Sequence, residues 1–106
     1  MGLTFKENCP DHRNTRVIDL VKSFKDLNCN VDVYDPWVNK VQAADEYNIK
    51  IIDKPMKDKY DAIIIAINHD EFKALTGDQI RAFGKTNHVL YDIKYLLKAN
   101  ESDGRL

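Results

Sequence analysis

A continuous run of apolar residues, AIIIAI at 62–67, constrains the fold more than any other feature of the chain. An unbroken apolar strand is typical of a parallel sheet with both faces covered, whereas a strand with one face in water alternates apolar and polar residues. Apolar residues spaced three and four apart at 15–27 indicate a helix that could cover such a sheet. The run therefore favours an α/β fold in which 62–67 is a strand buried on both faces.

Strand and helix patterns alternate along the rest of the chain. We expect further strands at 1–5, 31–34, 49–52 and 88–93. We expect further helices at 39–48, 69–75 and 77–83. Asn14 or Thr15 is the candidate N-cap of the first helix, and Asn28 is its candidate left-handed stop. This order predicts a Rossmann-like, doubly wound, mainly parallel sheet with helices on both faces, in three layers.

The composition excludes several classes of function. A chain of 106 residues has the length of one domain, and its net charge of −1 gives no reason to expect nucleic acid or an anionic membrane as a partner. No apolar stretch approaches the ~20 residues that span a bilayer. Cys9 and Cys29 have no metal-ligand spacing, so a reduced, cytoplasmic setting is expected. The first strand of such a sheet is usually central and buried, yet only four residues precede Phe5. We therefore expect the chain to be a fragment of a longer protein.

Several candidate binding residues follow the predicted strands. In an open parallel sheet, ligands bind beyond the carboxyl ends of the strands. Lys6 and Lys94 fall on this edge, and Arg13 lies just before the first helix, so the three could bind a phosphate or could be solvated surface charges. Asp35 could meet a ribose hydroxyl or form an Asp-Pro turn, and we favour the turn. The segments at this edge are 5–13, Asp35, 68–70 and 92–94.

A dinucleotide-binding loop is missing from the start of the chain. The G-x-G-x-x-G pattern lets the backbone approach a pyrophosphate. Here only Gly2 is present, and Pro10 lacks the N–H that such a loop would donate. We therefore expect side chains to hold any bound anion. The three histidines have no spacing that pairs one with Cys9, so no catalytic or metal-binding residue is expected.

Five segments stand out when they are taken together. They are GLTFKENCPDHRNTRVIDLV, VDVYDPWV, YDAIIIAINHDEF, VLYDIK and DGRL. In this order they resemble the C-terminal, UDP-binding domain of the UDP-glucose/GDP-mannose dehydrogenase family. The resemblance implies an NAD-dependent enzyme that oxidises the C6 hydroxyl of a UDP-sugar to a carboxylate, giving a UDP-uronic acid for surface polysaccharide synthesis. Residues 1–106 would then be a single C-terminal UDP-sugar-binding domain of a longer dehydrogenase, inactive in isolation.

The resemblance also implies partners and site residues. The full-length homodimer would carry an N-terminal NAD-binding domain, the glycine fingerprint and the catalytic cysteine outside residues 1–106. Phe5 and Lys6 match a Phe-Lys pair that contacts the nucleotide sugar, and Arg13 matches the arginine of an Asp-x-Arg that faces NAD. Lys94 stands where many relatives have an arginine that reaches the sugar nucleotide. Lys94 thus departs from the family pattern, because a lysine ammonium is a point charge, whereas an arginine guanidinium is planar and can donate two parallel hydrogen bonds.

The form FKENCPD-x-RNTRVID is most similar to the UDP-N-acetylhexosamine 6-dehydrogenase branch, with UDP-glucose as the next candidate substrate. Two other interpretations remain open. One is a free-standing Rossmann-like nucleotide-binding or interaction domain without dehydrogenase activity. The other is a receiver domain of a two-component system, which needs an acidic pair for Mg²⁺ after its first strand. This chain has Phe5 and Lys6 at that point.

Overall fold

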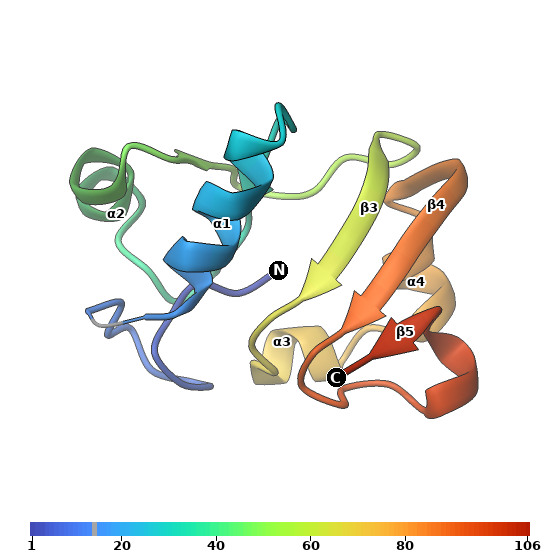
Figure 1. Ribbon diagram of the computed structural model, residues 1–106. Helices are drawn as coiled ribbons and strands as arrows, with labels where there is room; N and C mark the ends of the chain where they lie inside the picture. Colours follow the sequence, from blue (N-terminus) through green and yellow to red (C-terminus); the bar gives the residue numbers. More distant parts are fainter. Residues whose placement is uncertain (14) are drawn as a thin grey trace.

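The computed structural model describes residues 1–13 and 15–106. Its helices are α1 (Val17–Asp26), α2 (Lys40–Tyr47), α3 (Asp70–Lys73) and α4 (Gly77–Arg81), with a short 3-10 helix at Ala99–Glu101. Its strands are β1 (Asp32–Val33), β2 (Lys50–Ile51), β3 (Tyr60–Ile65), β4 (Gly84–Asp92) and β5 (Gly104–Arg105). The strand pairs run parallel, and each helix lies within its predicted range. The α/β class is confirmed (Figure 1).

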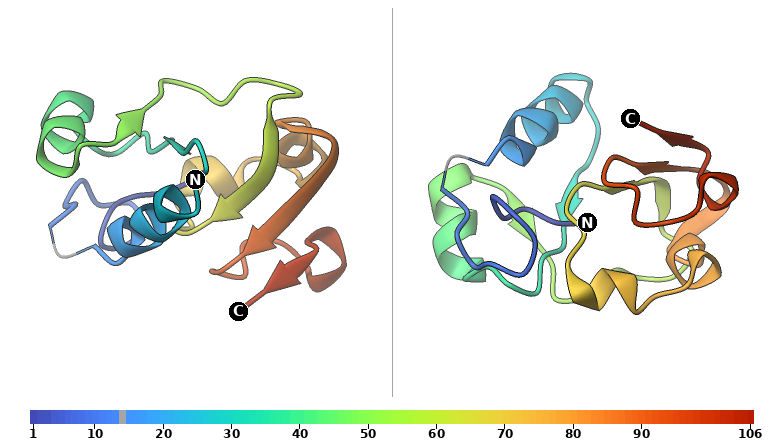
Figure 2. Two further views of the ribbon diagram at one scale, coloured as in Figure 1. Left: turned by 45° about the horizontal axis from the view of Figure 1, so that its top comes forward. Right: turned by 90° about the horizontal axis from the view of Figure 1, so that it is seen from below.

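The first two residues of the chain connect two separate sheets. One sheet pairs β1 with β2, and the other has the order β3-β4-β5. The Met1 ammonium donates to the Ile64 carbonyl (2.7 Å), and the Ala66 N–H donates to the Met1 carbonyl (2.8 Å). On the opposite side, the Gly2 N–H donates to the Tyr34 carbonyl (2.8 Å). The N-terminus accordingly lies between the two halves of the molecule in every view (Figures 1 and 2).

The predicted strand at 1–5 is wrong, because the structure assigns no strand to these residues. The N–H groups of Leu3 and Thr4 donate to the side chain of Asp35 (2.7 and 3.1 Å) instead of to a neighbouring strand. Because a carboxylate that accepts two successive N–H groups draws the chain out of the sheet, only the first two residues keep strand-like pairing. The spatial order across the molecule is β2, β1, Met1–Gly2, β3, β4 and β5.

The side chains of β3 show which helix covers which face of the sheet. Ile63 and Ile65 are buried and belong to one apolar cluster with Ile80 of α4. Ala62 and Ile64 point the other way, toward a groove that α1 also lines. Because successive side chains of a strand point to opposite faces, α1 and α4 cover opposite faces and the predicted three layers are confirmed. The expected burial on both faces is wrong for the start of the run, where Ala62 is exposed.

The ends of α1 and the start of β4 agree with the sequence pattern only in part. The Thr15 hydroxyl accepts the N–H of Val17 (3.2 Å), but the N-cap position of α1 is Arg16, which makes no side-chain capping hydrogen bond, so the predicted cap at Thr15 is wrong. The alternative candidate, Asn14, lies outside the described residues. Asn28 has a φ of 64°, the left-handed stop that was predicted. β4 begins before the predicted position 88, because its pairing with β3 already starts at Gly84.

Candidate functional site

The loops that follow the parallel strands meet at one edge of the sheet, as predicted. Residues 4–8, which we call the Phe-Lys loop, come directly after the opening segment. Hydrogen bonds join this loop to the end of β1 through Asp35 and to the loop after β3 through His69. This edge therefore forms one connected structure from segments that are far apart in the sequence.

Asp35 anchors the start of the Phe-Lys loop. Its side chain is fully buried, and its Oδ2 accepts the N–H groups of Leu3 and Thr4, while Oδ1 accepts the N–H of Trp37 (2.7 Å). Burial opposes ionisation of this carboxyl, but the hydrogen bonds from His69, Leu3 and Trp37 outweigh it and hold the pKa of Asp35 below its usual range. The predicted Asp-Pro turn is confirmed. A role in binding ribose does not fit a carboxylate with no exposed surface.

His69 anchors the other end of the loop. The ring is fully buried, its Nε2 lies 2.9 Å from Asp35 Oδ2, and its Nδ1 accepts the N–H of Asn8 (2.8 Å). A nitrogen that accepts an N–H carries no proton, so the neutral ring holds its proton on Nε2 and donates to Asp35. The Thr4 hydroxyl lies 3.2 Å from the same Nε2 and donates to the Lys6 carbonyl (2.9 Å). The buried side chains of Asp35 and His69 thus hold the two ends of the Phe-Lys loop.

Two of the three predicted substrate residues, Phe5 and Lys6, lie on the outer side of this anchored loop. Phe5 is 58% exposed, although it is a large apolar residue, and Lys6 is exposed beside it. The Phe5 N–H donates to the Asp11 carbonyl (2.8 Å), which folds the following segment back against the loop. Asn8 completes the turn with a φ of 54°. The fold therefore presents an aromatic ring and an ammonium next to each other at the surface.

Arg13 is brought to the same corner by Asp11. The guanidinium donates through Nε and one Nη to the two carboxylate oxygens (3.1 and 3.3 Å). These hydrogen bonds lower the pKa of Asp11 and raise the pKa of Arg13. The Arg13 side chain is still 79% exposed, so one face of the planar group remains accessible to solvent.

Lys94 lies on the same edge but in a separate loop, which a second buried aspartate holds. Asp92 is fully buried at the end of β4, and its carboxylate accepts the N–H groups of Lys94, Leu96 and Leu97 (3.2, 3.1 and 2.8 Å). The Lys94 side chain is exposed. Because β3 lies between β4 and the opening segment, about 10 Å, or two strand spacings, separates this loop from the Phe-Lys loop. The structure brings Lys6 and Lys94 to one edge without bringing them into contact.

Sequence reasoning nominated the structural residues of this edge by their position after strands, but it missed the contacts that they make. His69 was within a nominated segment, but Asp35 is 34 positions away in the sequence, and no spacing rule connects the two. Asp92 was likewise nominated only by its position after a strand. The available signal was a short polar residue at the carboxyl end of a buried strand, where it can accept the N–H groups of the turn that follows.

Residues 1–13 and 15–106 contain no group of three or more His, Cys, Asp or Glu side chains that could hold a metal ion. Cys9 and Cys29 are both free thiols. No helix within those same residues has the length and apolar character needed to cross a membrane.

Comparison with known proteins identifies the family. Residues 1–99 match the UDP-glucose/GDP-mannose dehydrogenase family, UDP binding domain. A UDP-N-acetyl-D-glucosamine 6-dehydrogenase of Salmonella typhi is 51% identical over 106 residues, which are 100% of this chain and 25% of that protein. The enzyme of the same name from Pseudomonas aeruginosa is 53% identical over 106 residues, again 100% of this chain and 25% of that protein.

A UDP-glucose 6-dehydrogenase of Rickettsia bellii is 32% identical over 105 residues, which are 95% of this chain and 24% of that protein. The chain therefore spans about a quarter of the length of these curated relatives. The family match agrees with the exposed Phe5 and Lys6 in excluding a receiver domain, which needs carboxylates there. The chain belongs to the UDP-glucose/GDP-mannose dehydrogenase family and corresponds to its UDP binding domain.

Proposed function

We propose that this chain is the nucleotide-sugar-binding domain of a longer, NAD-dependent UDP-sugar 6-dehydrogenase, and that the Phe-Lys loop contacts the substrate. The observation that carries the proposal is the anchoring of this loop. Asp35 and His69 hold its two ends through buried hydrogen bonds, while Phe5 and Lys6 are exposed. A loop that is ordered before the ligand arrives loses less conformational freedom on binding.

Each exposed group has a distinct role in this proposal. The Phe5 ring covers an apolar face of the nucleotide sugar, and the Lys6 ammonium pairs with a phosphate oxygen. Lys94 supplies a second cation from the loop that Asp92 holds. Because these side chains are exposed at a surface, a second domain has to cover the ligand from the other side. Closure of the two domains would exclude water and orient the C6 hydroxyl.

The residues present fit only one edge of an NAD site. The chain has no glycine-rich loop, but Arg13 offers an exposed guanidinium that Asp11 holds in place. We propose that Arg13 faces the cofactor and that the rest of the cofactor site lies in the N-terminal domain of the same polypeptide. Bound NAD supplies the hydride acceptor, while the residues of this chain bind, orient and shield the substrate.

We further propose a UDP-N-acetylhexosamine as the substrate, converted to a UDP-uronic acid for surface polysaccharide synthesis. Support comes from the two relatives at 51% and 53% identity, both of which are UDP-N-acetyl-D-glucosamine 6-dehydrogenases. UDP-glucose is the second candidate, because a UDP-glucose 6-dehydrogenase is 32% identical. We expect a cytoplasmic homodimer, as nucleotide sugars and NAD are cytoplasmic metabolites.

The test is a Lys6→Ala substitution in the full-length protein, assayed by NADH formation with UDP-N-acetylglucosamine, UDP-N-acetylgalactosamine and UDP-glucose. Loss of a charge-assisted contact to substrate should lower kcat/KM by roughly 10- to 150-fold, which corresponds to ~1.5–3 kcal/mol. The melting temperature should not change, because Lys6 is exposed. Lys57→Ala is the matched control, since Lys57 is an exposed lysine before β3, at the opposite end of the sheet.

Equal kinetics for Lys6→Ala and Lys57→Ala would indicate that Lys6 is an ordinary surface charge. That result would contradict its proposed contact with the substrate. The 106-residue chain alone should form no NADH with any of these sugars. NADH formation by the isolated chain would contradict the proposal that most of the NAD site lies in the N-terminal domain. A full-length protein that contains no NAD-binding domain would favour a free-standing nucleotide-binding domain instead.

A further inference from the structure

His12 is a buried histidine between the two members of an exposed ion pair. It is 7% exposed, whereas the Asp11 and Arg13 side chains on either side of it pair with each other at the surface. A buried imidazole needs hydrogen-bond partners inside the protein, because water does not reach it. The partners of His12 therefore show what this surface segment is attached to.

The last turn of α2, which lies beside the opening segment (Figure 2), supplies these partners. The Tyr47 hydroxyl donates to the His12 carbonyl (2.6 Å), and His12 Nδ1 lies 3.2 Å from the same hydroxyl oxygen. Because the carbonyl takes the single hydroxyl proton, Nδ1 carries the other proton and donates to the Tyr47 oxygen. Nδ1 also lies 3.5 Å from Glu46 Oε2, and the two rings meet edge to face. Tyr47 thus fixes both the side chain and the backbone of His12.

Tyr47 is itself held in place by the way in which α2 ends. The helix stops at Asn48, whose φ of 53° is left-handed, a conformation that asparagine tolerates better than most residues. From α1, the Lys25 ammonium donates to the Asn48 carbonyl (2.8 Å). Tyr47 also packs against the apolar cluster that contains Val21 of α1 and Ala43 of α2. The hydroxyl that holds His12 therefore belongs to an element that is fixed on the core.

The same contacts bear on the position of Arg13. Its N–H donates to Asp11 Oδ1 (2.9 Å), and its guanidinium donates to both oxygens of that carboxylate. An exposed ion pair holds its members together only weakly, and it does not attach the pair to the rest of the protein. Burial, followed by the charges of Glu46 and Asp11, raises the pKa of Tyr47, so the hydroxyl keeps the proton that it donates. His12 thus ties the Asp11–Arg13 pair to α2.

We propose that His12 and Tyr47 are positioning residues for the cofactor and that they act through Arg13. The two hydrogen bonds between them, which we call the His12–Tyr47 clasp, fix residues 11–13 on α2. The guanidinium is then presented at one place, and less conformational freedom is lost when NAD binds. This inference rests on the role proposed above for Arg13. It makes the affinity for NAD depend on a hydroxyl that is 34 positions away from Arg13 in the sequence.

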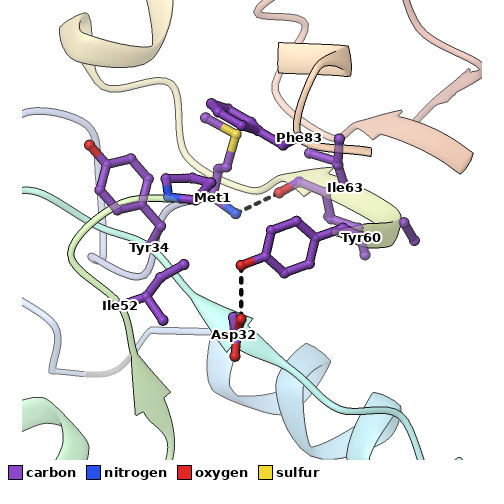
Figure 3. A pocket seen from close by; sticks show the side chains of 10 residues that line it. Met1, Asp32, Tyr34, Ile52, Tyr60, Ile63 and Phe83 are labelled. Carbon is purple, nitrogen blue, oxygen red and sulfur yellow. Dashed lines mark hydrogen bonds between the residues drawn. The ribbon is translucent and has the colours of Figure 1, made fainter. Parts of the chain in front are cut away.

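The test is Tyr47→Phe in the full-length protein, which removes the hydroxyl and keeps the ring. We expect KM for NAD to rise about three- to tenfold, measured by NADH formation with the most active UDP-sugar of the panel above, and KM for that sugar to stay unchanged. Tyr60→Phe is the matched control, because the Tyr60 hydroxyl donates to Asp32 (2.8 Å) at the opposite end of the sheet (Figure 3). It also loses one tyrosine hydrogen bond, but it should change neither KM.

A double-mutant cycle separates positioning from a general loss of stability. If Tyr47 acts through Arg13, adding Tyr47→Phe to Arg13→Ala should leave KM for NAD at the value that Arg13→Ala alone gives. Additive effects would overturn this inference and leave the proposed role of Arg13 intact. The same holds for an unchanged KM for NAD in Tyr47→Phe when Arg13→Ala raises it. No effect of Arg13→Ala would overturn both the role of Arg13 and this inference.

Two substitutions of His12 test the other half of the His12–Tyr47 clasp. His12→Asn places an amide N–H near the position of Nδ1 and should keep KM for NAD close to that of the unsubstituted enzyme, whereas His12→Ala should raise it as Tyr47→Phe does. Hydrogen exchange of residues 11–13, followed by mass spectrometry, should be faster in His12→Ala and Tyr47→Phe than in Tyr60→Phe. Equal exchange in the three variants would show that the clasp does not order this segment and would overturn the inference.

Discussion

The two ends of the sheet differ in how they satisfy their buried polar groups. At the carboxyl end, the Asp35 carboxylate accepts three backbone N–H groups and a histidine N–H, and the chain supplies every one of these partners. At the amino end, α1 and β3 line a groove of about 940 Å³, and the Met1 ammonium is buried against the Ile64 carbonyl. Side chains satisfy the buried polar groups of the first end, whereas a charged terminus is buried at the second.

The difference shows where a side chain can supply the hydrogen-bond partners of buried backbone groups and where only another strand can. A single carboxylate can reach several N–H groups of an irregular loop, because its two oxygens accept from several directions. A strand edge presents a regular row of donors and acceptors, which only another strand can pair in full. The loops of the candidate site are therefore held by side chains from distant elements, whereas backbone hydrogen bonds of Met1 and Gly2 join the two halves at the centre of the molecule.

The largest expected effect is at the carboxyl end. Asp35→Ala leaves the N–H groups of Leu3, Thr4 and Trp37 and the His69 proton without their acceptor in a buried site. We expect a loss of ~3–5 kcal/mol in the free energy of unfolding, measured by urea denaturation. Asp45→Ala, at an exposed position of α2, is the control and should change it by less than ~0.5 kcal/mol. Similar stabilities for the two variants would show that the Asp35 network is not the main support of this edge.

A smaller effect is expected at the amino end, from the Met1 amine. Its pKa of about 6 in the folded chain lies below the ordinary value of 8.0, so the folded chain binds fewer protons than the unfolded chain between these values. The free energy of unfolding should therefore rise as the pH increases from 6 to 8, by up to about 2 kcal/mol.

Acetylation of the terminus removes the charge, so the acetylated chain should lose this pH dependence and keep the stability of the high-pH form. Urea denaturation at several pH values measures both. A pH dependence that survives acetylation would have to come from other groups. It would contradict the claim that the buried Met1 ammonium lowers the free energy of unfolding at low pH.

The smallest effect concerns the hydrogen bond that crosses the groove. The Tyr60 hydroxyl donates to Asp32 (2.8 Å), and burial together with this carboxylate raises the pKa of Tyr60 to about 12 (Figure 3). Tyr60→Phe should cost ~1 kcal/mol near neutral pH. Because the folded pKa is raised, the contribution of this group is present below pH 10 and is lost as the pH rises toward 12. Tyr60→Phe should therefore lack that alkaline loss, and an unchanged alkaline transition would contradict the role given to this bond.

The sequence by itself determined the α/β class, the positions of the helices and the edge that carries the candidate site. These predictions rest on local periodicity and on the rule that the ends of parallel strands coincide, so they need no knowledge of distant contacts. The left-handed stop at Asn28 and the Asp-Pro turn at Asp35 were also predicted, because the residue types themselves favour those conformations.

Only the tertiary structure decided where the opening segment leaves the sheet and what holds the Phe-Lys loop. Leu3 was predicted as part of a strand from its apolar neighbours, yet its N–H bonds to a side chain that is 32 positions away. His69 showed no motif, and its role follows from the two partners that the fold places on its two ring nitrogens. Interactions between residues that are distant in sequence leave no periodic trace, because their geometry exists only after the elements have packed together.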